Sequence, residues 1–174
     1  IGIHAHNDTE HAVANSFAAV EAGARHIQGT LNGLGERCGN ANLISIIPTL
    51  LLKEPFKSKY RINVTLEKLS QLTAISRTLD DVLNRVPLKQ SAYVGASAFA
   101  HKAGLHASAI LKAPETYEHI NPGLVGNQRV IPMSNQAGQS NLRMRLKEAG
   151  LFVENNDPKL LKILNEIKTR EDEG

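Results

Sequence analysis

The sequence is poor in residues that mark secreted or membrane proteins. Its 174 residues include one cysteine, no tryptophan and 4% aromatic side chains. Cys38 on its own cannot form an internal disulfide, and this usage is typical of a reducing compartment. No signal peptide opens the chain, and the most apolar run, 43–52, is too short to span a bilayer and contains Pro48. We therefore expect a cytoplasmic protein without a membrane partner.

The charge balance does not indicate a nucleic-acid partner. The 20 basic and 17 acidic residues leave a formal charge of +3, and few aromatic residues lie between the basic ones. With 41% hydrophobic and 21% charged residues, the composition is that of a globular protein. The length suffices for one domain with a substantial core or for two small ones. Seven histidines are more notable than the charge.

Two of these histidines, His4 and His6, follow an apolar start that predicts a strand. Residues i and i+2 of a strand point to the same side, with backbones about 7 Å apart. Two imidazoles at this spacing can converge on one metal ion, although a strand histidine can equally be an ordinary polar residue. Asn7 and Asp8 then end the strand, and either can cap the helix that follows.

The first thirty residues predict a strand, a helix and a second strand. Apolar residues recur at spacings of three and four within 9–22, as in an amphipathic helix, and Gly23 is a plausible stop. The segment 25–30 then predicts the second strand. This length is typical of a βαβ unit and favours a parallel α/β sheet or barrel over an antiparallel fold.

A glycine-rich loop, 29–40, follows the second strand. Four glycines suggest a backbone that closely approaches another group, at a position where α/β folds place ligands. A flexible turn is the alternative, and neither the Walker nor the Rossmann spacing is present. The acidic and basic pair within the loop favours binding. We expect substrate contacts from Asn32, Gly33, Glu36 and Arg37.

Helical patterns dominate the remainder. The segment 42–53 is apolar nearly all round and predicts a buried helix, whereas 55–64 is polar and predicts a linker. Thr65 should cap a single long amphipathic helix over 66–86 that Pro87 stops. Shorter pieces follow: helices over 105–112, 142–149 and 158–168, a strand or extended segment over 130–133, and a frayed tail over 169–174.

Several motifs together resemble the family of 2-isopropylmalate, homocitrate and citramalate synthases. They are His4-Ala5-His6-Asn7-Asp8, Gly29-Thr30-Leu31-Asn32-Gly33, Gly35-Glu36-Arg37-Cys38-Gly39-Asn40, Phe99-Ala100-His101-Lys102 with Gly104-Leu105-His106, Pro114-Glu115-Thr116-Tyr117-Glu118-His119 and Gly138-Gln139-Ser140-Asn141. The resemblance runs from residue 1 to about 149. The segments 99–106 and 114–118 are more similar to citramalate synthases than to the leucine-pathway enzymes.

The resemblance implies an α/β fold: the C-terminal portion of a (β/α)8 TIM barrel followed by mainly helical subdomains. His4, His6 and Asn40 would be ligands of one divalent ion (Mn, Mg, Zn or Co), and an aspartate ligand would precede Ile1. A complete barrel takes about 250 residues, so we expect a piece of a longer enzyme. The expected parts are the last βα units over 1–54, a linker over 55–64, a helical subdomain with a catalytic loop over 65–135, and a second small helical subdomain over 136–174.

The implied activity is that of an acyltransferase. A metal-assisted Claisen condensation would join acetyl-CoA to a 2-oxo acid, and thioester hydrolysis would release CoA. Pyruvate, giving citramalate for isoleucine biosynthesis, is the favoured oxo acid; a 2-isopropylmalate synthase of leucine biosynthesis is the alternative. By motif, His106 and Tyr117 would be catalytic and would act across a homodimer. His101 is interpreted as structural, and so would be His106 without the resemblance.

Two further interpretations stay open. An aldol-cleaving CoA lyase of the same superfamily would share the barrel and the metal, but such lyases carry Gly-Gly-Cys-Pro where this chain has Gly35-Glu36-Arg37-Cys38-Gly39. A non-enzymatic helical dimerisation module with a piece of barrel is the other. We expect the 174-residue chain to be inactive by itself.

Overall fold

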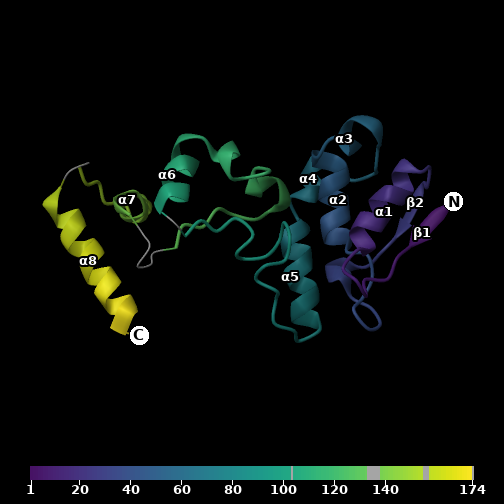
Figure 1. Cartoon of the computed structure of the whole chain (residues 1–174), viewed down its shortest axis with the longest axis horizontal. Helices are drawn as coiled ribbons and strands as arrows, with labels where there is room; N and C mark the ends of the chain where they lie inside the picture. Colours follow the sequence, from purple (N-terminus) through teal and green to yellow (C-terminus); the bar gives the residue numbers. More distant parts are fainter. Residues whose placement is uncertain (103, 133–137, 155–156, 174) are drawn as a thin grey trace. The chain divides into compact units, whose positions relative to one another are not determined.

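The computed structural model describes residues 1–102, 104–132, 138–154 and 157–173. It has a mixed α/β fold and divides into two compact units (Figure 1). The first unit comprises residues 1–98 and 122–127, and the second comprises 99–121 and 128–174. In the described parts, no helix is long and apolar enough to cross a membrane.

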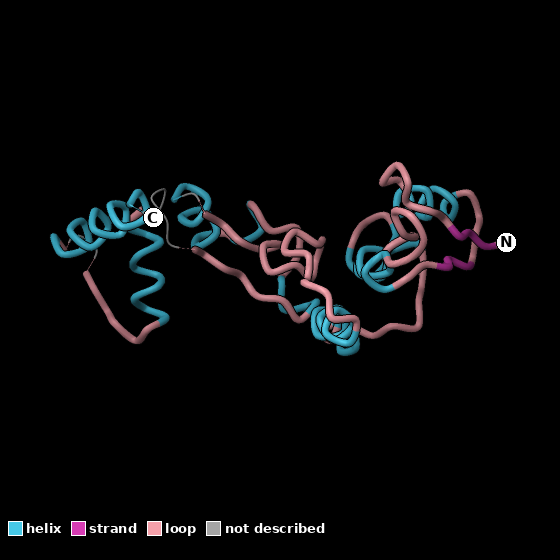
Figure 2. Tube along the Cα trace, turned by 90° about the horizontal axis from the view of Figure 1, so that it is seen from below, coloured by secondary structure: helices cyan, strands magenta, loops and turns pink. Residues whose placement is uncertain are grey.

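The first unit opens with the βαβ unit that the sequence predicts. Strand β1 (Gly2–His4) leads into helix α1 (Ala12–Glu21) and then strand β2 (His26–Gln28). The two strands, magenta in Figure 2, pair in parallel, and Ile3 lies opposite Ile27 in the register. The Asn7 side chain accepts a hydrogen bond of 3.2 Å from the Ala12 amide at the start of α1. The prediction of a parallel α/β arrangement is confirmed, whereas the barrel stays a prediction.

Helix α2 (Leu43–Leu52) supplies the core against which α1 packs. The Asn42 side chain caps it by accepting from the Ile44 amide at 3.0 Å, as expected for this residue type. Ile46 and Leu50 form the buried cluster together with Ala12 of α1 and Ala41. The buried helix predicted for 42–53 is therefore confirmed.

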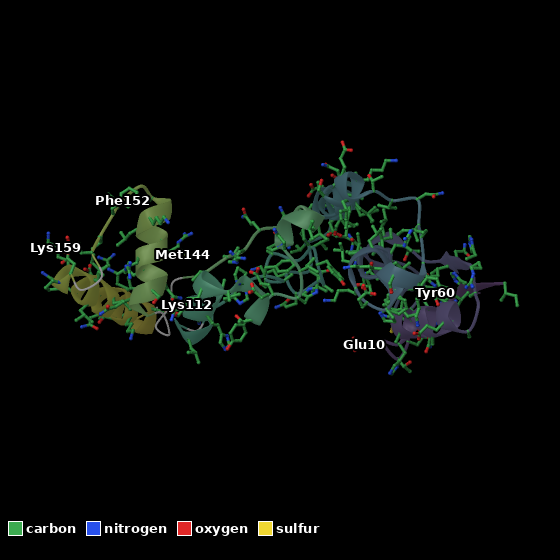
Figure 3. All side chains as sticks on the ribbon, turned by 90° about the horizontal axis from the view of Figure 1, so that it is seen from above. Glu10, Tyr60, Lys112, Met144, Phe152 and Lys159 are labelled. Atoms are coloured by element: carbon green, nitrogen blue, oxygen red, sulfur yellow. The ribbon has the colours of Figure 1, made fainter. Side chains whose placement is uncertain are left out.

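The segment predicted as a linker contributes to this core. It contains a short helix, α3 (Phe56–Lys59), and the Phe56 ring lies 4.7 Å from that of Phe17. Tyr60, which is labelled in Figure 3, donates a 3.4 Å hydrogen bond to the Val20 carbonyl of α1. Because the segment 55–64 is mostly polar, its aromatic contacts could not be predicted from the sequence. The predicted domain boundaries at 54 and 64 stay predictions, and the one at 135 lies outside the described residues.

The single long helix predicted for 66–86 is wrong. The structure has α4 (Leu66–Leu69), capped by the Thr65 hydroxyl as predicted, and a separate helix, α5 (Leu72–Val82). At the break, the Ser70 hydroxyl donates to the Glu67 carbonyl at 2.7 Å. Gly126, at φ +69°, approaches the Ser70 carbonyl so closely that a Cβ there would collide with it.

Helix α5 ends at Val82, two residues before a left-handed asparagine, rather than at Pro87. Asn84 adopts a left-handed conformation, with φ 51°, after the last helical residues. Its amide donates to the Asp81 carbonyl at 3.1 Å, and the Arg85 amide donates to the Asp80 carbonyl at 2.9 Å. This is the Schellman arrangement, in which two otherwise unpaired carbonyls at the helix end are satisfied.

The second unit is mainly helical, whereas the predicted helical subdomains over 65–135 and 136–174 stay predictions. It contains α6 (Gly104–Lys112), the 3-10 turn η2 (Pro114–Thr116), α7 (Gln139–Glu148) and α8 (Pro158–Glu173). A buried cluster of leucines, Leu142, Leu160 and Leu164, joins α7 to α8. Two further 3-10 turns, η1 (Leu31–Gly33) and η3 (Pro122–Val125), belong to the first unit.

Two smaller predictions in the second unit need comment. The frayed tail is wrong as far as Glu173, because α8 continues to that residue with an ion pair of 2.7 Å between Glu166 and Arg170, one turn apart. In the predicted segment 130–133, Val130 forms an isolated parallel bridge with Ala100. Met133 lies outside the described residues.

Candidate functional site

Three side chains that the sequence predicts as metal ligands converge in the first unit. His4 ends β1, His6 follows two residues later, and Asn40 ends the glycine-rich loop opposite His6, with which it forms an antiparallel bridge. Asn40 Nδ2 lies 3.2 Å from His4 Nε2 and 3.3 Å from His6 Nδ1. The two imidazole centroids are 5.1 Å apart, with nearly perpendicular planes.

The glycine-rich loop fixes Asn40 through its backbone. The Asn40 amide donates to the Gly33 carbonyl at 3.1 Å, and the Asn7 amide donates to the Gly39 carbonyl at 2.9 Å. Gly39 has φ +84°, and a Cβ on it would collide with the Gly33 carbonyl. A Cβ on Gly35 would likewise meet the Asn40 side-chain oxygen. Both glycines are therefore required where they stand.

This donor set fits a divalent ion. One nitrogen of each imidazole faces the same carboxamide, and a half-turn of that group would present its oxygen in place of its nitrogen. A mixed nitrogen and oxygen set suits several divalent metals. The described residues contain no cluster of three or more His, Cys, Asp or Glu side chains. The candidate site therefore depends on Asn40 as its third ligand.

An ion pair ties the loop to the segment after the histidines. Arg37, in a left-handed conformation, donates to both carboxylate oxygens of Asp8 at 3.0 to 3.2 Å. The hydrogen bond from Arg37 is the main cause that lowers the pKa of Asp8. Glu36 is exposed beside Arg37, with 3.9 Å between their charged groups. Substrate contacts from Glu36 and Arg37 stay predictions.

The Asn32 side chain connects the loop to α5. Its amide nitrogen donates to the Ser76 carbonyl at 3.0 Å and to an Asp80 oxygen at 3.1 Å. Its oxygen accepts from the Ser76 hydroxyl at 2.7 Å. No local pattern links residues so far apart, so the sequence did not indicate this contact. The expectation that Asn32 and Gly33 bind substrate stays a prediction.

The predicted catalytic side chains contact each other in the second unit. His106 lies on α6, and Tyr117 follows η2 eleven residues later. Their ring centroids are 4.4 Å apart, and their planes are inclined by 34°. Both side chains are exposed, Tyr117 to 45%. A histidine and a phenol in contact at a surface can transfer or orient a proton.

A buried ionic cluster lies next to this pair, and sequence reasoning missed it. Glu118, whose side chain is 3% exposed, accepts two hydrogen bonds of 2.6 Å from Arg129. His101 Nε2 lies 3.3 Å from the same carboxylate. The Arg129 hydrogen bonds lower the pKa of Glu118, and Glu118 in turn raises the pKa of Arg129. A hollow of about 330 Å³ adjoins Glu118 and Arg129. The only signal was the acidic residue directly after Tyr117.

Two family models cover nearly the whole chain. Residues 1–79 match the model described as HMGL-like, and residues 93–174 match the one described as homocitrate synthase post-HMGL domain-like. The two matches follow one another in the order that the second description implies. The chain is therefore similar to proteins that carry a homocitrate-synthase-type domain after an HMGL-like one.

Individual relatives show which enzymes the chain is similar to. The (R)-citramalate synthase of Aquifex aeolicus is 52% identical over 174 residues, which is 100% of this chain and 32% of that protein. The (R)-citramalate synthase of Synechocystis is 48% identical over 100% of this chain and 31% of its own length. A probable 2-isopropylmalate synthase of Methanopyrus kandleri is 37% identical over 100% of this chain and 33% of its own length. The predicted resemblance is confirmed, and the chain spans about a third of the length of these relatives.

Proposed function

We propose that the chain is part of an acyltransferase that condenses acetyl-CoA with pyruvate to give citramalate. The convergence of His4, His6 and Asn40 on one point carries this proposal. Similarity to (R)-citramalate synthases over the full chain, at higher identity than to the 2-isopropylmalate synthase of Methanopyrus kandleri, supports the choice of pyruvate. A cytoplasmic location stays part of the proposal, argued from Cys38 alone.

We further propose that the first unit is the C-terminal portion of a TIM barrel. Its β1 and β2 are adjacent parallel strands joined by a helix, which is the repeat of that fold. His4 ends β1, and the glycine-rich loop follows β2, so both lie at the carboxyl edge of the strands. TIM-barrel enzymes place their active sites at this edge.

His4, His6 and Asn40 would hold the divalent ion. When bound, the ion would polarise the ketone of the oxo acid as a Lewis acid. The Arg37–Asp8 pair would keep the glycine-rich loop, and with it Asn40, in its place beside the histidines. Glu36 and the Gly33 backbone are the proposed contacts to the oxo acid from the same loop.

His106 and Tyr117 would transfer the proton. The imidazole would accept a proton from the methyl group of acetyl-CoA, and the resulting carbanion would attack the ketone carbon. The ketone oxygen would take up the electron pair of the C=O bond and a proton and become a hydroxyl group. The Tyr117 hydroxyl would orient the imidazole or donate a hydrogen bond, in agreement with the 4.4 Å between the rings. Water would then hydrolyse the thioester and release CoA. We propose that the pair serves the site of a second subunit in a homodimer.

A substrate comparison on the full-length enzyme tests the proposal. Release of free CoA from acetyl-CoA would be measured with pyruvate and with 2-oxoisovalerate as acceptors. We expect a preference for pyruvate of roughly 10- to 200-fold, the discrimination that a methylene provides in an apolar pocket. An equal or reversed preference would favour a 2-isopropylmalate synthase instead, which the Methanopyrus relative supports.

The same assay distinguishes the condensation from the lyase and from the dimerisation module. An aldol-cleaving lyase would release no CoA from acetyl-CoA with either oxo acid, and would instead split a 3-hydroxyacyl-CoA. A helical dimerisation module would do neither. Either result would overturn the proposed condensation.

A further inference from the structure

The ionic cluster of the second unit lies directly beside the proposed proton-transfer pair. Glu118 is the residue after Tyr117, and His101 precedes His106 by five residues. Arg129 comes from a third segment and binds both oxygens of Glu118 at 2.6 Å. We call His101, Glu118 and Arg129 the clamp. It joins the segment before α6 to the segment that carries Tyr117.

Backbone hydrogen bonds hold the chain segments that carry the clamp side by side. The His101 amide donates to the Val130 carbonyl at 2.9 Å, and the Val130 amide donates to the Phe99 carbonyl at 3.0 Å. This places Arg129 and His101 on neighbouring segments of chain. On the other side of Glu118, the His119 ring stacks on Phe99 with 5.9 Å between centroids and 10° between planes. Glu118 and His119 are thus both anchored, while Tyr117 projects to the surface.

The choice of charged groups here needs an explanation. A buried carboxylate loses much hydration, and only excellent geometry offsets that loss, so such pairs are weak contributors to stability. A bidentate hydrogen bond between arginine and a carboxylate fixes the relative orientation of the two groups, because both are planar. An apolar side chain at position 118 would fill the same space without defining the orientation of its neighbour.

We infer that the clamp positions Tyr117 against His106, with Glu118 and Arg129 as positioning residues for the proton transfer. The inference rests on the proposed function for its kinetic consequences, whereas its geometric content is independent of that function. Displacing a reacting group by about 1 Å can lower a rate roughly 100-fold, so loss of the clamp should be visible in turnover.

The first test uses Arg129→Gln and Glu118→Gln in the full-length enzyme. We expect kcat to fall roughly 10- to 100-fold in each, because Tyr117 is no longer held against His106. The KM for the oxo acid should change little, since the predicted metal ligands are untouched. Arg129→Lys keeps the charge but loses the two-pronged bond, so it should restore only part of kcat.

Arg170→Gln is the matched control. Arg170 forms a 2.7 Å bond to Glu166, but that pair is exposed on α8. Removing the same functional group there should leave kcat and KM unchanged. If Arg170→Gln lowers kcat as much as Arg129→Gln does, the effect is not specific to the clamp and the inference fails.

A double-mutant cycle separates positioning from general stabilisation. In a Tyr117→Phe background, Arg129→Gln should lower kcat less than it does in the wild type, because the hydroxyl that the clamp positions is already gone. Equal losses in both backgrounds would overturn the inference.

A spectroscopic measurement tests the position of Tyr117 against His106 without measuring enzyme activity. With labelled histidine and tyrosine, a nuclear Overhauser effect between the His106 and Tyr117 rings should be present in the wild type, where the centroids are 4.4 Å apart. It should weaken in Arg129→Lys and Glu118→Gln, even if Arg129→Gln fails to fold. A wild type that releases no CoA would refute the proposed function alone. An unchanged signal in folded clamp variants would refute the inference alone.

Discussion

At the scale of single residues, the candidate metal site depends on glycines as much as on its ligands. Gly39 has a positive φ and lies against the Gly33 carbonyl, which accepts the hydrogen bond from Asn40. The pair His4 and His6 could be recognised in the sequence because a strand fixes the direction of alternate side chains, whereas Asn40 was implied only by the family resemblance. The contacts of Asn32 and Arg37 could not, since each joins residues 29 or more positions apart.

Gly39→Ala should weaken metal binding without changing a ligand. The new Cβ would displace the Gly33 carbonyl and with it Asn40, and changes beside metal ligands commonly lower affinity roughly 10- to 100-fold. Gly150→Ala is the control, because Gly150 has a similar φ of +77° but no atom within 4 Å of the added Cβ. Calorimetry of Mn²⁺ binding to the full-length enzyme measures both.

Equal affinities in the two glycine variants would contradict this account of the loop.

The 174-residue chain alone should bind Mn²⁺ weakly, since one predicted ligand lies outside it. If that chain bound the ion at micromolar concentration after both His4 and His6 had been changed to Ala, the ligand assignment would be wrong.

His106→Ala should lower the turnover number by roughly two to four orders of magnitude, the range typical of a general acid or base. The oxo-acid KM should change much less, because the predicted metal ligands lie in another part of the chain. Steady-state kinetics with pyruvate provide both constants. His11→Ala serves as a control, since that histidine is exposed, its ring lies 3.1 Å from the Thr9 hydroxyl, and it has no role in the proposed reaction. Nearly full activity of His106→Ala would rule out the catalytic role.

At the scale of elements, local patterns predicted two polar helix caps and the stop of α1 at Gly23, which has φ +109°, but not the break within 66–86. Asn42 and Thr65 cap their helices through their own side chains, and these contacts are local. The break after Leu69 involves Gly126, which is distant in sequence, and α5 ends at Val82 before the left-handed Asn84. An asparagine can occupy helix interiors, ends or turns, so its left-handed conformation was not evident from the pattern 66–86.

The clamp should make the stability of the second unit depend on pH. Arg129 lowers the pKa of Glu118 in the folded state, so between the folded and unfolded pKa values the unfolded state binds more protons. The stabilisation is therefore complete above the ordinary glutamate value of about 4.3 and is lost as the pH falls through the lowered value. Thermal unfolding measured near Tyr117 should show this loss of stability. The pH range from 3 to 6 is suitable because it lies around the ordinary glutamate value.

Glu118→Gln should be less stable at pH 6 but should lose the additional acid sensitivity, because its amide does not titrate. Glu166→Gln is the control, since its exposed pair with Arg170 is expected to contribute little. If Glu118→Gln and the wild type lose stability in parallel on acidification, another group is responsible.

At the scale of the whole molecule, the chain spans about a third of its relatives' length. The completion of its metal site by a ligand from another part of the enzyme stays a prediction. A single helix over 66–86 would have formed a spacer of roughly 30 Å toward a second subunit. Because α4 and α5 are separate, this support for a shared site is gone. The exposed apolar side chains Ile75 and Val82 of α5 still offer a surface on which two copies could pair.

Subunit mixing tests the shared site directly. If His106 serves the partner's metal site, a heterodimer of one His106→Ala subunit and one His4→Ala subunit contains one composite site with both changes and one with neither. Each homodimer should be nearly inactive, and mixing after dissociation should restore up to about half of the activity per heterodimer, since distant sites act independently. Heterodimer formation would be verified by differently tagged subunits. If heterodimers form without regaining activity, both residues serve the site of their own subunit, and the homodimer proposal loses its catalytic basis.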